Sequence, residues 1–166
     1  MNKLELFRDI TTFVFDVDGV LTDSNLFFFE NGRIVRRLHE RDLFALRQAV
    51  TKGFRVAIIS GGPLNALQAI FHDLHIVDIY SKASDKKAVY DELKTVYNLR
   101  DEEILYMGDD LPDYLTMRLV GLPTCPANAV PEIKEIAQYQ SPYRGGEGCV
   151  RDVVERVLKL NKKWNV

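Results

Sequence analysis

Two aspartates one residue apart, Asp16 and Asp18, follow directly on the apolar run Thr12–Phe15 and precede Gly19. A short apolar run without alternation is typical of a strand buried on both faces of a parallel sheet. Two like charges at the end of such a strand are costly unless a cation or hydrogen-bond donors compensate them. The pair therefore predicts that something of opposite charge binds at this strand end.

Further polar residues with a chemical use follow other apolar runs or begin a helix. They are Ser60-Gly61-Gly62, Lys86, and the acidic group Asp109, Asp110 and Asp113. A serine hydroxyl and backbone N–H groups before a helix cradle an anion, and a lysine adds a compact positive charge. Carboxylates from two strand ends form a hard oxygen site that suits Mg²⁺. Together these residues predict a Mg²⁺-dependent phosphoryl-transfer site.

The elements that must position these residues alternate between strand and helix along the chain. The patterns predict strands at 12–15, 54–59, 78–80, 104–107 and 122–125. They predict helices at 42–52, 64–74, 85–97 and 150–160, a short helix that ends at 120, and another that begins at 131. Such alternation specifies an α/β fold, a doubly wound (Rossmann-like) parallel sheet with helices on both faces. Ligands bind outside the carboxyl ends of the strands in such sheets, which is where the polar residues fall.

A β-hairpin is predicted just after the first acidic pair, because Asn31-Gly32 stands between the β-prone runs Leu26–Glu30 and Arg33–Arg36. Asn-Gly is the strongest short hairpin signal, since a type I′ turn needs positive φ twice. The hairpin, at about residues 25–37, could be a flap that shields the site in place of a cap domain. An ordinary edge hairpin, with its phenylalanines in the core or in a subunit contact, is equally compatible with the pattern.

Length and composition restrict the class of protein. The 166 residues suit a single domain, 1–166, and the net charge of −2 gives no electrostatic case for nucleic acid or an anionic membrane. No apolar run reaches the length of a membrane span, and Met1–Ile10 lacks the apolar core of a signal peptide. Cys125 and Cys149 are far apart in sequence, as expected of reduced thiols in a cytoplasmic protein.

The same motifs carry a family resemblance. Asp16-Val17-Asp18-Gly19-Val20, Ser60-Gly61-Gly62, Lys86 and Gly108-Asp109-Asp110-Leu111-Pro112-Asp113 resemble the motifs of the haloacid dehalogenase-type phosphatases, in spacing as well as residue type. The early Asp-Gly-Val-Leu-Thr-Asp and the late Gly145–Arg151 stretch resemble the small capless branch of that superfamily. This branch includes phosphatases of 3-deoxy-D-manno-octulosonate 8-phosphate (KDO 8-phosphate), an acid sugar phosphate.

The resemblance implies a role for each matched residue. Asp16 is expected to be the nucleophile that forms an aspartyl-phosphate, and Asp18 the general acid and then base. Ser60, Gly61 and Gly62 are expected to hold the phosphoryl group, and Lys86, rather than the adjacent Lys87, to neutralise its charge. The side chains of Asp16 and Asp109 and the backbone carbonyl of Asp18 are the expected Mg²⁺ ligands. Asp110 and Asp113 are expected to orient those ligands from behind.

The resemblance also implies how an open site is covered. Members of the branch assemble as homotetramers in which neighbouring hairpins and carboxyl-terminal tails close each site. Here the tail is expected at about residues 142–166, with Arg144 contacting substrate.

One departure affects the substrate. Family members often carry an arginine after the second-motif glycine and more along the next helix, whereas this chain has Gly62–Ala69 without a cation. A phosphate of a related nine-carbon 2-keto-3-deoxy sugar acid is therefore an alternative substrate. The candidates to replace the missing cations are Arg36, Arg37, Arg41 and Arg144.

Two non-enzymatic alternatives remain open. A phospho-acceptor signalling domain also uses acidic pairs, Mg²⁺ and an aspartyl-phosphate. Such domains carry the phosphorylated aspartate on a middle strand and the lysine after a later strand, whereas Asp16 lies on the first strand and Lys86 precedes Gly108. A non-catalytic relative is disfavoured because the motif residues are all present.

Overall fold

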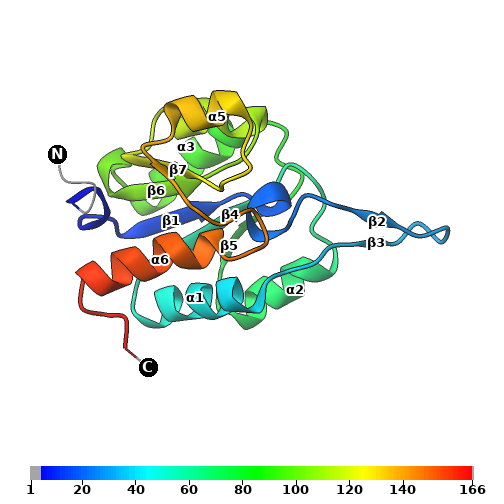
Figure 1. Cartoon of the computed structure of the whole chain (residues 1–166), viewed down its shortest axis with the longest axis horizontal. Helices are drawn as coiled ribbons and strands as arrows, with labels where there is room; N and C mark the ends of the chain where they lie inside the picture. Colours follow the sequence, from blue (N-terminus) through cyan, green and yellow to red (C-terminus); the bar gives the residue numbers. More distant parts are fainter. Residues whose placement is uncertain (1–4, 166) are drawn as a thin grey trace.

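The computed structural model describes residues 5–165 and contains a six-stranded, entirely parallel sheet in the order β5-β4-β1-β6-β7-β8 (Figure 1). The strands are β1 (Thr12–Phe15), β4 (Arg55–Ile59), β5 (Asp78–Tyr80), β6 (Ile104–Met107), β7 (Leu122–Cys125) and β8 (Tyr139–Gln140). The predicted doubly wound α/β fold is confirmed. The two-residue strand β8 was not predicted, because its edge position requires no long apolar run.

Helices cover both faces of the sheet (Figure 1). One face carries α1 (Glu40–Thr51), α2 (Ala66–Asp73) and α6 (Cys149–Leu160), and the other carries α3 (Lys86–Tyr97), α4 (Tyr114–Met117) and α5 (Pro131–Ile136). Successive side chains of a strand point to opposite faces. Phe13 and Phe15 therefore enter the core under α1 and α6, while Val14 enters the core under α3. Burial on both faces explains why the sequence of β1 is continuously apolar.

The strand register determines where the polar residues meet. Phe15, the last residue of β1, lies opposite Ile58 of β4 and Met107 of β6. The strand order reverses at β1, because β4 continues the sheet on one side and β6 on the other. Ligands bind at such a switch point, outside the carboxyl ends of the strands.

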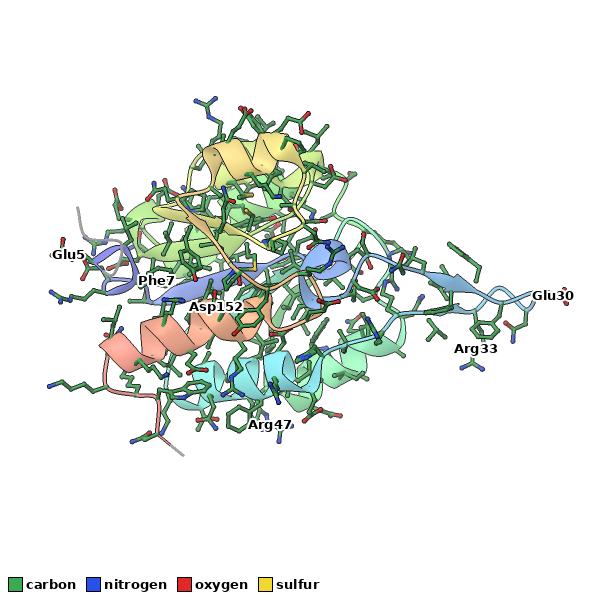
Figure 2. The ribbon with its side chains drawn as sticks, viewed as in Figure 1. Glu5, Phe7, Glu30, Arg33, Arg47 and Asp152 are labelled. Carbon is green, nitrogen blue, oxygen red and sulfur yellow. The ribbon has the colours of Figure 1, made fainter. Side chains whose placement is uncertain are left out.

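The hairpin consists of β2 (Phe27–Phe28) and β3 (Ile34–Val35) and projects away from the sheet (Figure 1). Figure 2 shows Glu30 and Arg33 at its far end. The predicted type I′ turn is wrong. At this turn only Gly32 has positive φ, at 80°, and the N–H of Phe29 donates to the carbonyl of Arg33 at 2.9 Å. The loop is therefore of the longer kind, in which a glycine in the left-handed region closes the turn.

Short turns complete the structure. They are the 3₁₀ turns Glu5–Phe7, Asp101–Glu103 and Leu111–Asp113, and the π-type turn Val17–Leu21. Within residues 5–165, no helix is both long and apolar enough to span a bilayer.

Candidate active site

A tight turn after β1 places the first acidic pair. The carboxylate of Asp16 accepts a 2.7 Å hydrogen bond from the N–H of Val17, and the N–H of Thr22 returns to the carbonyl of Val17 at 3.0 Å. Gly19 lies inside the turn at φ 92°, and a Cβ there would overlap the carboxylate of Asp109. Glycine is therefore required both by the backbone conformation and by the close approach of the β6 loop.

Three carboxylates meet below this turn. Oxygens of Asp16, Asp109 and Asp113 all lie within 4.8 Å of one another. Burial, followed by the charge of Asp113, raises the pKa of Asp16 well above its usual range. The same two causes raise the pKa of Asp109 to about 7. A cation would relieve this repulsion, and an all-oxygen donor set suits Mg²⁺ rather than a softer metal. The residues present therefore fit a magnesium ion held by Asp16 and Asp109.

Lys86 connects the cluster. Its Nζ lies 2.9 Å from Oδ1 of Asp16 and 2.7 Å from Oδ1 of Asp113, and its side chain is 4% exposed. Burial opposes the charge, but the two carboxylates outweigh burial and raise the pKa of Lys86. Asp85 caps α3 by accepting from the N–H of Ala88, so the helix begins with Lys86 pointing into the site. The next lysine points elsewhere: Nζ of Lys87 pairs with Asp91 at 2.6 Å.

Asp113 is fully buried and organises the floor of the site. Besides Lys86, it accepts hydrogen bonds from the hydroxyl of Tyr106 at 2.7 Å and from the N–H of Asp109 at 3.1 Å. A Cβ at Gly108 would overlap Asp113, so that glycine lets the side chain fold back under β6. Sequence reasoning missed Tyr106. The available signal was a hydroxyl inside an otherwise apolar strand, which needs a buried partner.

The turn after β4 forms the candidate anion cradle. The hydroxyl of Ser60 is buried and has no hydrogen-bond partner. A Cβ at Gly61 would lie 3.9 Å from Cε of Lys86, and one at Gly62 would lie 3.8 Å from Oδ2 of Asp18. The turn thus lies between the lysine and the second aspartate. An orphaned hydroxyl beside a buried ammonium group fits an oxyanion such as phosphate.

Asp18 lies at the mouth of the site and is held by the hairpin. Nε of Arg36 lies 2.8 Å from Oδ1 of Asp18, and Nη2 lies 3.4 Å from Oδ2. The sequence named Arg36 only as one of several candidate cations. Its partner could not be identified, because the contact depends on how the hairpin returns to the sheet.

Asp110 and Arg144 are not brought into the cluster. Asp110 is exposed and its carboxylate accepts from the N–H of Leu111, which caps the following 3₁₀ turn. The side chain of Arg144 is exposed, while the glycines after it pack against this chain's own first loop. The N–H of Gly146 donates to the carbonyl of Val20 at 2.9 Å, and a Cβ at Gly145 would overlap the carbonyl oxygen of Gly19.

The largest cavity described lies elsewhere and is not part of this cluster. It measures about 730 Å³ and lies between the start of α1 and the outer face of α6, with His39, Arg41, Arg151 and Arg156 among its lining residues. Its arginines on α6 are already paired with acidic neighbours on the same helix, Glu155 and Asp152. The acidic cluster at the sheet edge is where several buried carboxylates and a lysine meet.

Known proteins resemble this chain over nearly its whole length. The family model for haloacid dehalogenase-like hydrolases matches residues 73–151. The 3-deoxy-D-manno-octulosonate 8-phosphate phosphatase KdsC of Yersinia pestis is 33% identical over 155 residues, covering 93% of this chain and 83% of the relative. KdsC of Escherichia coli K12 is 33% identical over 156 residues, covering 94% and 83%.

Solved structures agree with the sequence comparison. The crystal structure of the Yersinia pestis phosphatase superposes with a TM-score of 0.94 at 31% identity, covering 98% of this chain and 88% of that one. The Moraxella catarrhalis phosphatase, crystallised with magnesium ion, phosphate ion and KDO, superposes with a TM-score of 0.91 at 26% identity, covering 95% and 91%.

Proposed function

Because the chain belongs to the haloacid dehalogenase-like hydrolases, in the family of the KDO 8-phosphate phosphatases, we propose that it is a Mg²⁺-dependent phosphomonoesterase. Its substrate is an acid sugar phosphate, with KDO 8-phosphate as the first candidate. The products are then KDO and phosphate, and the reaction serves lipopolysaccharide precursor synthesis in the cytoplasm.

The observation that carries the proposal is the bridge made by Lys86 between Asp16 and Asp113, together with the unpartnered hydroxyl of Ser60 in the turn whose Gly61 borders Lys86. A buried ammonium group and a free hydroxyl beside a carboxylate can hold a phosphoryl group against an oxygen nucleophile. Within the described residues, Ser60 and Thr116 carry the buried hydroxyls without a partner, and the turn of Ser60 is the one that borders Lys86. The arrangement therefore supports phosphoryl transfer rather than a non-catalytic relative.

Each proposed role follows from position. The carboxylate of Asp16 attacks phosphorus, the ester P–O bond breaks, and Asp18 protonates the departing sugar oxygen. Water then attacks the aspartyl-phosphate, Asp18 takes its proton, and phosphate leaves. Ser60, the Gly61 and Gly62 amides and Lys86 hold the phosphoryl oxygens throughout. Asp16, Asp109 and the carbonyl of Asp18 would hold Mg²⁺, which would neutralise charge on the phosphoryl group.

Behind these groups, Asp113 positions Lys86, and Asp110 caps the 3₁₀ turn Leu111–Asp113 that carries Asp113. Arg144 remains a proposed substrate contact, made from the tail of a neighbouring subunit. The exposed hairpin phenylalanines Phe27, Phe28 and Phe29 support the proposal of a homotetramer of single-domain chains, since large exposed apolar patches mark contact surfaces. A monomer in light scattering that kept full activity would contradict this assembly.

A related nine-carbon 2-keto-3-deoxy sugar acid phosphate is the second candidate substrate. The observation that favours it is α2, which follows the phosphate cradle and carries no lysine or arginine in Ala66–Asp73. The sugar-binding groups therefore differ from the family pattern, while the phosphoryl groups do not.

The test is phosphate release from a panel of sugar phosphates, including KDO 8-phosphate and its nine-carbon relatives. We expect Mg²⁺-dependent release from an acid sugar phosphate, lost with EDTA and in Asp16→Asn. Asp91→Asn, at a half-exposed carboxylate that pairs with Lys87, is the matched control. Wild-type activity in a folded Asp16→Asn protein would refute the mechanism. A preference for another acid sugar phosphate would change only the substrate.

A further inference from the structure

Two consecutive arginines fasten the base of the hairpin to the first loop, and they do so differently. Arg36 pairs with Asp18 through a side chain that is 3% exposed, whereas Arg37 pairs with Asp23 at 2.9 Å through a side chain that is 66% exposed. A single antiparallel bridge between Thr22 and Leu38 closes the base between them. An exposed pair adds little to stability, so the partly buried Arg36–Asp18 pair is the one that holds the hairpin base more firmly.

The guanidinium of Arg36 occupies the entrance to the site. It forks onto both oxygens of Asp18, at 2.8 Å and 3.4 Å. Its Nη2 also lies 3.6 Å from the position that a Cβ at Gly62 would occupy, so it borders the phosphate cradle. A planar guanidinium that engages a carboxylate in this way is equally suited to any other carboxylate presented at the same place.

The ion pair with Arg36 restrains Asp18, which is the proposed general acid and base. Asp18 keeps free lone pairs in this pair, but the guanidinium holds its carboxylate in one orientation at the entrance. An anion that arrives with the substrate and takes over the guanidinium releases Asp18 from this orientation. The phosphate already has Ser60 and Lys86, so the second anion must belong to the rest of the molecule.

Arg36 lies where the surrounding structure offers few other cations. α2 follows the cradle without a lysine or arginine, and the groove between it and the hairpin is lined by Arg36, Leu64, Asn65 and Leu67 among others. Within the described residues lining this groove, the cations are Arg33 and Arg36. Figure 2 places Arg33 at the far end of the hairpin, which leaves Arg36 as the cation at the entrance.

We propose that Arg36 is the specificity-determining residue that binds the carboxylate of an acid sugar phosphate, and that Asp18 holds it in that place while the site is empty. The inference rests on the proposed function and deepens it. When the substrate carboxylate takes over the guanidinium, both oxygens of Asp18 become free for the reacting groups. A neutral sugar phosphate cannot make the exchange, so it finds Asp18 still engaged.

The test compares two substrates in matched variants. Arg36→Gln and the control Arg37→Gln are each assayed with KDO 8-phosphate and with a neutral ester, mannose 6-phosphate. In Arg36→Gln we expect kcat/KM to fall about 10- to 100-fold for the acid sugar, as for a lost charge-assisted hydrogen bond. We expect it to stay level or rise for the neutral sugar, because Asp18 is no longer held. Arg37→Gln should change neither value.

A damaged fold would lower both rates together, which separates a structural role from recognition. Inhibition by inorganic phosphate should be unchanged in Arg36→Gln, whereas inhibition by free KDO should weaken. If Arg36→Gln does not fold, Arg36→Lys is the deciding variant. It keeps the charge but not the two-nitrogen contact, so the ratio of kcat/KM for the acid sugar to that for the neutral sugar should be intermediate.

The outcomes are distinguishable. A wild-type protein without preference for acid sugar phosphates would overturn the proposed function and this inference together. If the wild type preferred acid sugar phosphates and both Arg36→Gln and Arg36→Lys kept that preference unchanged, only the inference would be overturned.

Discussion

The hydroxyl of Tyr106 and the ammonium group of Lys86 meet on one oxygen, Oδ1 of Asp113, each at 2.7 Å. Because Lys86 also contacts Asp16, a continuous chain of charge-assisted hydrogen bonds runs from the core of the sheet to the proposed nucleophile. The direction of the Lys86 side chain is therefore set by a residue that no substrate touches.

The hydrogen bonds from Tyr106 through Asp113 to Lys86 predict that the buried Tyr106 affects catalysis. Tyr106→Phe removes the hydroxyl without opening a cavity, so Asp113 can turn and Lys86 loses its fixed position. We expect kcat to fall about 10-fold with KM within about a factor of two, and the unfolding free energy to drop by about 1–2 kcal/mol. Steady-state kinetics and urea unfolding measure the two effects. An unchanged kcat would show that the hydroxyl only stabilises the fold.

Lys86 and Lys87 form a natural pair of variants. Lys86→Gln removes the cation that contacts both Asp16 and Asp113, and we expect kcat to fall at least about 100-fold. Lys87 pairs with Asp91 on the outer side of α3, so Lys87→Gln should keep wild-type activity. Circular dichroism on both proteins controls for folding. Equal losses in the two variants would argue against the assignment of Lys86.

The glycines after Arg144 support the first loop from behind. Gly145→Ala inserts a methyl group against the carbonyl oxygen of Gly19, so the loop that carries Asp18 must move. We expect kcat to fall about 10-fold or more, since small displacements of reacting groups are costly. Gly32→Ala is the control: its added methyl group meets no atom within 4 Å at the hairpin turn. Its positive φ should cost only about 1 kcal/mol of stability and no activity.

Asp42 makes stability depend on pH. Its carboxylate is fully buried at the start of α1, where it accepts a 2.8 Å hydrogen bond from the N–H of Arg151. Burial raises its pKa from 3.8 to about 6, although the Arg151 N–H and His39 favour the charged form. The folded protein then holds this proton more tightly than the unfolded chain, so the group costs stability as pH rises from about 4 to about 6.

Asp42→Asn keeps the acceptor and removes the charge. Relative to wild type, its unfolding free energy should gain about 2–3 kcal/mol between pH 4 and pH 8. Urea unfolding across this range measures the gain. In the control Asp91→Asn, at a half-exposed carboxylate, the unfolding free energy should change with pH as it does in wild type. If the unfolding free energy of Asp42→Asn had the same pH dependence as wild type, burial of the Asp42 charge would not be its source.

Mg²⁺ should stabilise the folded protein, because it relieves the repulsion among Asp16, Asp109 and Asp113. At Mg²⁺ concentrations about 100-fold above Kd, we expect about 2.7 kcal/mol and a rise in Tm of about 5 °C or more over EDTA. Asp109→Asn should lose this rise and melt above wild type in EDTA, since it removes one of the repelling charges. Differential scanning fluorimetry measures both. An equal Mg²⁺ shift in Asp109→Asn would place the metal elsewhere.

Short-range sequence patterns were sufficient to predict the sheet and the candidate chemistry. Apolar runs without alternation identified β1, β4 and β6, and the polar residues that follow each run had to meet because parallel strands end at one edge. The resemblance to the family selected Lys86 over Lys87, because Asp85-Lys86 matches the family's register at this position. These inferences needed only local patterns, the family's register and the geometry of a parallel sheet.

Contacts between side chains of different elements emerged only in the folded chain. The hydrogen bond from Tyr106 to Asp113, the fork of Arg36 on Asp18 and the support of Gly19 by Gly145 join residues whose separation in sequence has no periodicity. Even the hairpin turn differed, because Gly32 alone took positive φ. Local pattern specifies the edge of the sheet at which a side chain lies, whereas packing between elements specifies its partner, as it does for Arg36 and Asp18.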